Sequence, residues 1–206
     1  MAEGFKIAVL VSGGGTNLQS IIDNIKQGNL NCTIDMVISD RRGAYALKRA
    51  QENNIKTYVV DRKEQGKKLS SKILNLVEGK VDLIVLAGWL SILEGDILKV
   101  FKDRIINIHP SLLPSFGGKG MFGIKVHEEA IKYGVRFSGC TVHIVDGGTD
   151  TGPIICQKIV QVHEDDDAKA LQERVLIEEH KALSETIKLF IDSKIAIEGR
   201  KVRIHK

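Results

Sequence analysis

The side chains best suited to catalysis lie at the end of an apolar segment, in the order Asn107-Ile-His109-Pro110. In an extended chain residues i and i+2 project to the same face, so the side chains of Asn107 and His109 are expected to point together. Pro110 favours an extended conformation of His109 and ends the strand, which would put the pair at the strand's carboxyl end. An imidazole beside a carboxamide suits proton transfer and stabilisation of an oxyanion. A buried core histidine with a capping asparagine would have the same spacing.

A second candidate site is the glycine-rich segment that follows an apolar run at residues 5–11. A loop between a strand and a helix exposes backbone N–H groups that can bind phosphate. It is no P-loop, since no Gly-Lys-Ser/Thr follows, and no full dinucleotide fingerprint, since Leu18 occupies the third glycine position. A single phosphate is the expected ligand, with Asn17 also suited to cap the helix, although a tight turn needing positive φ would use the same glycines. The expected contacts come from Gly13, Gly14, Gly15, Thr16 and Asn17.

Two carboxylates complete the set of candidate residues. Asp150 lies in a polar loop that could return to His109, where a carboxylate would raise the pKa of the imidazole and orient the ring. From the sequence alone, an Asp150 that stabilises a turn is the favoured interpretation, and the nearby His143 is typical of a strand histidine with its hydrogen bonds satisfied. Glu179 falls within the inward apolar stripe of a long helix, so its carboxylate must meet a ligand's hydroxyls or a buried basic partner.

The elements that must position these residues alternate between apolar strand-like runs and helices. This pattern predicts an α/β fold with an open, twisted, mostly parallel sheet, helices on both faces and antiparallel strands in the C-terminal part. One domain is expected over residues 1–206, with a first half at 1–110 and a second at 111–206. Strands are expected at 5–11, 33–39, 55–60, 81–87, 105–108, 140–145 and 153–162, helices from about 17 and at 44–53, 67–77, 93–100 and 167–192, and a hairpin at 195–204.

Composition excludes several classes of protein. The 206 residues are 43% apolar and 27% charged, which is typical of a globular protein, and the formal net charge is +4. The sequence has no basic run with interleaved aromatic residues, so nucleic-acid binding is not favoured. No apolar run reaches transmembrane length and no signal peptide precedes the first strand, so a cytoplasmic protein is expected. Cys32, Cys140 and Cys156 are widely spaced, which favours reduced thiols, buried at Cys32 and Cys156, over a metal site.

Four motifs together resemble the phosphoribosylglycinamide formyltransferase family: Ser-Gly-Gly-Gly-Thr-Asn-Leu, Ala-Gly-Trp-Leu-Ser-Ile-Leu, Asn-Ile-His-Pro-Ser-Leu-Leu-Pro and Asp-Thr-Gly-Pro. The resemblance covers nearly the whole chain, from Ile7 to about His180. It implies a Rossmann-like formyltransferase fold and transfer of the formyl group of 10-formyltetrahydrofolate to the amine of N1-(5-phospho-D-ribosyl)glycinamide, in de novo purine biosynthesis. The products would be the N-formyl compound and tetrahydrofolate, and no metal is required.

The resemblance also implies roles for particular residues. Asn107, His109 and Asp150 would be the catalytic residues, with a protonated His109 and Asn107 stabilising the oxyanion. The phosphate would lie on Gly13, Gly14, Gly15, Thr16 and Asn17, and Glu179 would bind the ribose. Folate would contact Leu90, Ser91, Ile92, Leu93, Asn107, Val145, Asp146 and Asp150.

The chain departs from relatives in two places. It has Leu90-Ser91 where many carry Met-Arg. Relatives also often carry a basic residue after the third strand that meets the folate tail, and Lys67 and Lys68 are the candidates for it here. The glycine-rich segment 117–123 is expected to form a mobile lid.

Other functions stay open from the sequence. A formyltetrahydrofolate deformylase would transfer the formyl group to water and methionyl-tRNA formyltransferase to a charged tRNA, but both resemble longer chains. A folate- or nucleotide-binding protein without turnover would not require His109 and Asp150 together. A nicotinamide oxidoreductase would need the full glycine fingerprint. The expected partners are small molecules, and a monomer or weak homodimer is expected.

Overall fold

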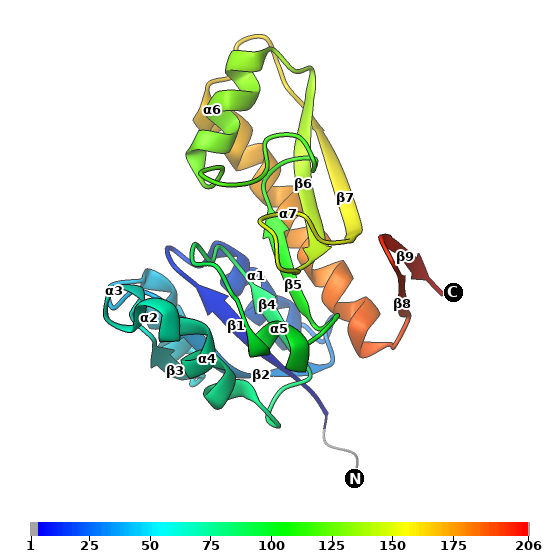
Figure 1. The fold of residues 1–206 in the computed structure, drawn as a ribbon. Helices are drawn as coiled ribbons and strands as arrows, with labels where there is room; N and C mark the ends of the chain where they lie inside the picture. The colour runs from blue at the N-terminus through cyan, green and yellow to red at the C-terminus, as the bar shows by residue number, and fades with distance from the viewer. Residues whose placement is uncertain (1–3, 206) are drawn as a thin grey trace.

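The computed structural model describes residues 4–205, so the outermost residues of the predicted 1–206 domain lie outside the described range. At its centre is a seven-stranded sheet in the order β3-β2-β1-β4-β5-β6-β7 (Figure 1). The first five strands of that order are parallel, β6 is antiparallel to β5, and β7 is antiparallel to β6. The predicted fold class is therefore confirmed. The strands are β1 Phe5–Val11, β2 Cys32–Ser39, β3 Lys56–Val59, β4 Leu83–Leu86, β5 Ile105–His109, β6 Phe137–Ile144 and β7 Ile154–Gln161.

Helices occupy most of the connections between strands. The helix predicted between about residues 67 and 77 is present as α4, but two short helical elements that the sequence did not predict come before it. The Asp61 carboxylate accepts a hydrogen bond from the Lys63 N–H and begins α3, and Gly66, with a φ of 50°, interrupts the helical path. The helices are α1 Thr16–Lys26, α2 Tyr45–Glu52, α3 Arg62–Gln65, the 3-10 turn η1 Gly66–Lys68, α4 Leu69–Val77, α5 Asp96–Val100, α6 Ile124–Tyr133 and α7 Ala168–Ile191.

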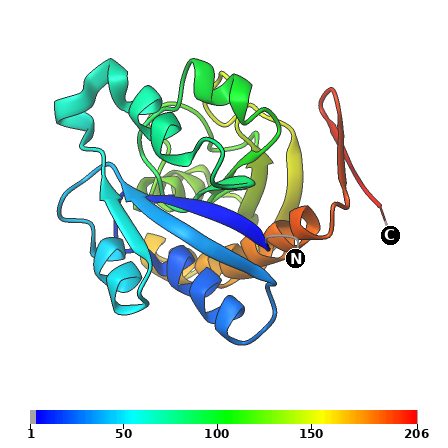
Figure 2. The ribbon, with the colours of Figure 1, turned by 90° about the horizontal axis from the view of Figure 1, so that it is seen from below.

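The sheet is covered on both faces because its central strands are apolar on both faces. Along β1, Ile7 and Val9 belong to one hydrophobic core, whereas Ala8 and Leu10 belong to the other. The first core includes residues of α1, α2, α6 and α7, and the second includes residues of α4 and α5. Figure 2 shows these two layers on opposite sides of the sheet.

The order of the strands creates a crevice at one edge of the sheet. The chain proceeds outward from β1 to β2 and β3, then returns to place β4 on the other side of β1. The two connections that leave β1 and β4 therefore diverge, and ligands of open α/β sheets bind at such a switch point. The glycine-rich segment follows β1, and His109 is the last residue of β5.

The C-terminal part follows the predicted pattern closely. Helix α7 begins where the Asp167 carboxylate accepts a hydrogen bond from the Ala170 N–H at 2.7 Å. The predicted hairpin is present as β8 Ile195–Glu198 and β9 Lys201–Ile204. All three cysteines are free thiols, but Cys156 is only half-buried, because β7 is the last strand of the sheet.

Within residues 4–205 no helix is long and apolar enough to cross a membrane.

Candidate active site

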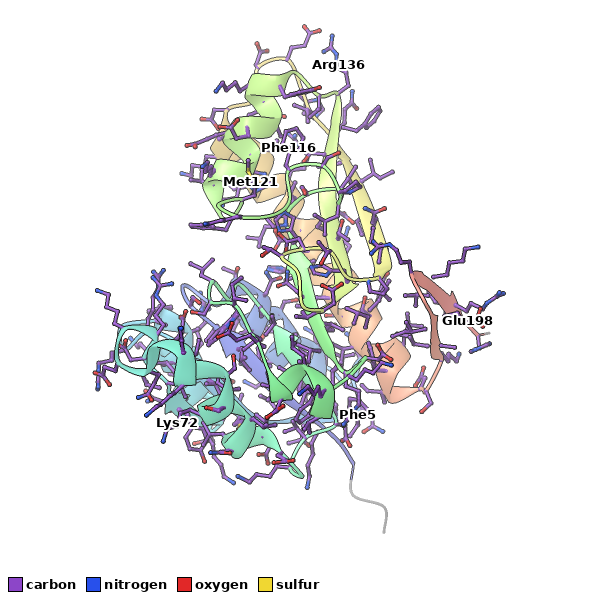
Figure 3. The ribbon with its side chains drawn as sticks, in the orientation of Figure 1. Phe5, Lys72, Phe116, Met121, Arg136 and Glu198 are labelled. Atoms are coloured by element: carbon purple, nitrogen blue, oxygen red, sulfur yellow. The ribbon has the colours of Figure 1, made fainter. Side chains whose placement is uncertain are left out.

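A cavity of about 680 Å³ opens at the carboxyl edge of the sheet. Its walls come from the segment after β4 (residues 88–93), the end of β5 (107–110), the segment before α6 (118–123), the loop after β6 and one face of α7. Phe116 and Met121 both belong to the connection from β5 to α6 (Figure 3). The residues expected to be catalytic, to bind the ribose or to contact the pterin all line this cavity, as do Thr16 and Asn17, whereas Gly13, Gly14 and Gly15 are not among the lining residues.

Asn107, His109 and Asp150 come together as the sequence predicts, and His143 joins them. The Asp150 carboxylate lies 3.5 Å from His109 Nδ1 and 3.6 Å from His143 Nε2. Asn107 Nδ2 lies 3.1 Å from His143 Nε2, because these residues are opposite each other in the antiparallel pairing of β5 with β6. The carboxamide, the two imidazoles and the carboxylate form one polar cluster.

The neighbours of each ring decide which nitrogen carries a proton. His143 Nδ1 lies 2.8 Å from the Ile144 carbonyl oxygen, so Nδ1–H must donate and Nε2 is the nitrogen that faces Asn107. Asn107 Nδ2–H then donates to His143 Nε2, and its second N–H is left for a ligand. His109 Nε2–H donates to the Phe116 carbonyl at 2.9 Å, so Nδ1 faces Asp150.

The expected rise in the pKa of His109 does not occur. His109 is 4% exposed, and this burial lowers the pKa of its imidazole more than the Asp150 carboxylate and the Phe116 carbonyl raise it. The prediction considered the carboxylate and not the desolvation. Asp150 therefore favours the charged form of His109, but burial outweighs this contribution and holds the pKa of the imidazole below its ordinary value.

Asp150 is held as a carboxylate. Burial raises its pKa, but His143 and His109 in their protonated forms and the Gly118 N–H, which donates to Asp150 at 2.9 Å, together lower it below the ordinary value. The Asp150 backbone has a φ of 58°, a left-handed conformation that Asp and Asn tolerate better than most side chains. The loop is therefore shaped to present this carboxylate to both histidines.

The glycine-rich segment makes the tight turn into α1. Gly15 has a φ of 74°, and a Cβ built there would lie 2.5 Å from the Ala46 Cβ of α2, so both backbone and space require glycine. Gly13 and Gly14 are exposed to solvent. The first N–H groups of α1 have no partner within the helix, as an anion site requires.

Asn17 does not cap α1, contrary to the prediction. The helix begins one residue earlier, at Thr16, and Asn17 Nδ2 instead donates to Glu179 Oε2 on α7 at 2.7 Å. Burial raises the pKa of Glu179 and the Asn17 hydrogen bond lowers it, with burial dominant. The buried Asn17 Oδ1 has no partner among the described residues. The Glu179 carboxylate thus meets an asparagine at the cavity wall rather than a buried basic residue.

The segment after β4 is anchored to the glycine-rich loop. The Ser12 hydroxyl accepts a hydrogen bond from the Leu90 N–H at 2.8 Å, and the Ser12 N–H donates to the Gly88 carbonyl at 3.0 Å. The Ser91 hydroxyl donates to the fully buried Asp40 carboxylate at 2.6 Å. Ser91 therefore donates a hydrogen bond to the Asp40 carboxylate, with which an arginine at position 91 could pair.

The loop after β6 is closed on itself by Asp146. Its carboxylate accepts hydrogen bonds from the Gly148 N–H at 3.0 Å and the Thr151 hydroxyl at 2.6 Å. Asp146 and Val145 line the cavity, whereas Lys67 and Lys68 do not.

Three residues at the site were missed or undervalued from the sequence. His143 is a bridge between Asn107 and Asp150, and only the pairing register of β5 with β6 reveals this. His127 on α6 lines the cavity and is buried, which lowers its pKa to about 4. Ser12 had no local signal beyond its position before the glycines. No group of three or more His, Cys, Asp or Glu residues between residues 4 and 205 is arranged to hold a metal ion.

An open α/β sheet with acid–base side chains and a glycine-rich loop at its carboxyl edge is the arrangement of an enzyme. The formyl transferase family model matches residues 5–187, and the chain belongs to this family. The family inferred from the sequence motifs is therefore confirmed.

Known proteins that the chain resembles carry more specific names. It is 39% identical over 193 residues to the chloroplastic phosphoribosylglycinamide formyltransferase of Vigna unguiculata, covering 92% of this chain and 62% of that protein. The chain thus spans less than two thirds of this relative. It is 35% identical to the phosphoribosylglycinamide formyltransferase of Bacillus subtilis (strain 168), covering 89% of this chain and 93% of that one. The crystal structure of glycinamide ribonucleotide transformylase 1 from Symbiobacterium toebii matches with a TM-score of 0.93 and 39% identity, covering 100% of this chain and 96% of that one.

Proposed function

We propose that this protein transfers the formyl group of 10-formyltetrahydrofolate to the amine of N1-(5-phospho-D-ribosyl)glycinamide, a step of de novo purine synthesis. The names of its relatives support this activity. The observation that carries it is the cluster of Asn107, His109 and Asp150 in one cavity, with Asn17 and Glu179 on the same cavity wall. Chemistry at one end and ribonucleotide recognition at the other suit a two-substrate transfer.

The ribonucleotide binds beside α1 and α7. Its phosphate lies against the backbone N–H groups of the glycine-rich loop, where the helix dipole favours an anion. A ribose hydroxyl donates to the Glu179 carboxylate, which keeps its hydrogen bond from Asn17. The glycinamide amine then points toward Asn107 and Asp150.

The folate binds along the segment after β4 and the loop after β6. Leu90, Ile92 and Leu93 give an apolar wall for the pterin, and Val145 faces it from the other loop. Backbone groups supply most of the polar contacts, since Ser91 and Asp146 already use their side chains within the protein. This arrangement brings the formyl carbon to the polar cluster.

Transfer proceeds by addition and elimination. The amine nitrogen forms a bond to the formyl carbon, and the carbonyl π electrons move to the oxygen. The second Asn107 N–H donates to this oxyanion, and His109 Nε2–H joins it once the formyl oxygen takes the place of the Phe116 carbonyl. Asp150 accepts the proton that the amine releases, and the oxyanion then re-forms the carbonyl as the carbon–nitrogen bond breaks and Asp150 returns the proton to the folate nitrogen. The products are the N-formyl compound and tetrahydrofolate, and the step uses no metal ion.

The activity is tested by mixing the protein with 10-formyl-5,8-dideazafolate, with and without the ribonucleotide, and following the folate absorbance. Deformylation that depends on the ribonucleotide, together with a formylated ribonucleotide by mass spectrometry, is the expected result. Formate released without the acceptor would identify a deformylase instead. Absence of turnover with both substrates bound would identify a binding protein.

A further inference from the structure

Helix α2 holds the glycine-rich loop from the side opposite its open face. The Arg49 Nε–H donates to the Gly14 carbonyl at 2.9 Å, and the Ala46 N–H donates to the Gly13 carbonyl at 3.0 Å. Two successive carbonyl groups of the loop therefore point at α2. Gly15 packs so closely against Ala46 that no side chain fits between them.

The geometry of the peptide bond turns these two contacts into an orientation of the loop. In a planar trans peptide the C=O of one residue and the N–H of the next point in opposite directions. Because the Gly13 and Gly14 carbonyls face α2, the N–H groups of Gly14 and Gly15 face away from it. Gly13 and Gly14 are exposed, so the side opposite α2 is open to an anion.

The Arg49 guanidinium is fixed by further contacts. Its NH1 group donates to the Gln19 side-chain oxygen on α1 at 3.2 Å, and its carbon lies 5.1 Å from the centre of the Tyr45 ring. Arg49 is half-buried and thus joins α2, the loop and α1. Because these partners already fix the guanidinium, Arg49 loses little side-chain conformational entropy when it also binds the loop carbonyl.

We propose that Arg49 is a positioning residue for the phosphate of the ribonucleotide. It acts through the Gly14 carbonyl, which it holds so that the next N–H is presented to the phosphate before the ligand arrives. Its positive charge also lies behind the loop and favours an anion on the other side. This inference rests on the proposed function for the identity of the ligand, but not for the presence of an anion site.

The neighbouring Lys48 provides a matched control. It is on the same helix and also lies over the Tyr45 ring, at 5.7 Å, but its ion pair is with Glu52 at 3.8 Å and not with the loop. Lys48→Gln removes one positive charge from α2 without touching the Gly14 carbonyl. Arg49→Gln removes the charge and the contact, and Arg49→Lys keeps the charge on a flexible ammonium group that lacks the planar fork of donors of the guanidinium.

Binding of ribose 5-phosphate by calorimetry tests the proposal without turnover, and steady-state kinetics test it with turnover. Arg49→Gln is expected to weaken ribose 5-phosphate binding and raise the KM for the ribonucleotide about tenfold, with kcat and the folate KM within about twofold. Arg49→Lys is expected to recover about a third of the loss, and Lys48→Gln to bind like the wild type.

Three results would overturn the proposal: unchanged ribose 5-phosphate binding in Arg49→Gln, an equal loss in Lys48→Gln, or a fall in kcat with KM unchanged. A wild-type protein that does not bind ribose 5-phosphate would overturn it as well. If Arg49→Gln does not fold, as judged by its melting transition, Arg49→Lys is used instead. A rise in its ribonucleotide KM with kcat unchanged then supports the proposal, and an unchanged KM overturns it. A wild-type protein that binds ribose 5-phosphate in an Arg49-dependent way without formyl transfer would refute the proposed function and leave this inference standing.

Discussion

Replacing Asp150 with asparagine separates the charge of the loop after β6 from its shape. Asparagine has nearly the same volume and also tolerates the left-handed backbone, so the φ of 58° at this position is retained. The change removes the negative charge that lies 3.5 Å from His109 Nδ1 and 3.6 Å from His143 Nε2. It also removes the acceptor for the proton that the amine releases.

The expected loss of rate follows from these distances. With an effective dielectric constant of about 20, opposite unit charges at the 3.5 Å separation of Asp150 and His109 attract by about 5 kcal/mol. In the proposed transfer the positive charge develops on the amine nitrogen that Asp150 deprotonates, and the same separation sets the scale of its attraction to the carboxylate. If about half of it is realised in the transition state, kcat falls about 60-fold, and loss of the proton acceptor adds to this. We expect kcat of Asp150→Asn to fall at least about 100-fold at pH 7.

The assay is steady-state transfer with both substrates saturating, compared with Asp103→Asn. Asp103 also has a left-handed backbone, with a φ of 60°, but lies outside the cavity. The ribonucleotide KM of Asp150→Asn should stay within about threefold, since the phosphate and ribose contacts are elsewhere. Retention of kcat within about fivefold of the wild type would refute the role of the Asp150 charge.

Three further substitutions test other parts of the site. Glu179→Gln is expected to raise the ribonucleotide KM about tenfold in steady-state assays, because a charge-assisted hydrogen bond is lost; an unchanged KM would contradict ribose binding there. Gly15→Ala is expected to lower the free energy of unfolding by about 2–4 kcal/mol in urea titrations, because its Cβ would meet Ala46, whereas Gly28→Ala, with open space around it, should lose only about 1 kcal/mol. The pKa of His127 is about 4 in the folded chain against 6.5 ordinarily, so the unfolded chain binds more protons in this window and stability falls as pH falls from 6.5 to 4. His127→Gln should reduce that fall by up to about 3 kcal/mol, and equal pH dependence in both proteins would contradict it.

The sequence predicts the fold well because its signals are local. The apolar runs of the parallel strands and the long stripe of α7 identify elements that the structure retains, including Leu171, Val175 and Leu183 as fully buried positions. The errors are at element ends. The short helix after Asp61 depends on one cap and one glycine, which periodicity does not register.

The site is harder to predict, because its contacts join distant segments. The i, i+2 spacing correctly puts Asn107 and His109 together, since strand geometry fixes it. The pKa of His109 could not be predicted, because desolvation depends on the surrounding fold and not on the nearest carboxylate. The partner of Asn17 could not be predicted either, because a local helix cap was the simpler alternative.

The hydrogen bond between Asn17 and Glu179 joins residues 162 positions apart in the chain. During synthesis the glycine-rich loop leaves the ribosome long before α7, so a nascent chain carries half of the proposed ribonucleotide site without its counterpart. Helix α7 also supplies fully buried residues to the core on its side of the sheet, including Val175 and Ile187. Ligand binding should therefore arise late and abruptly in translation. Chains arrested before residue 179 should be inactive and should expose an apolar face of the sheet to which a chaperone can bind.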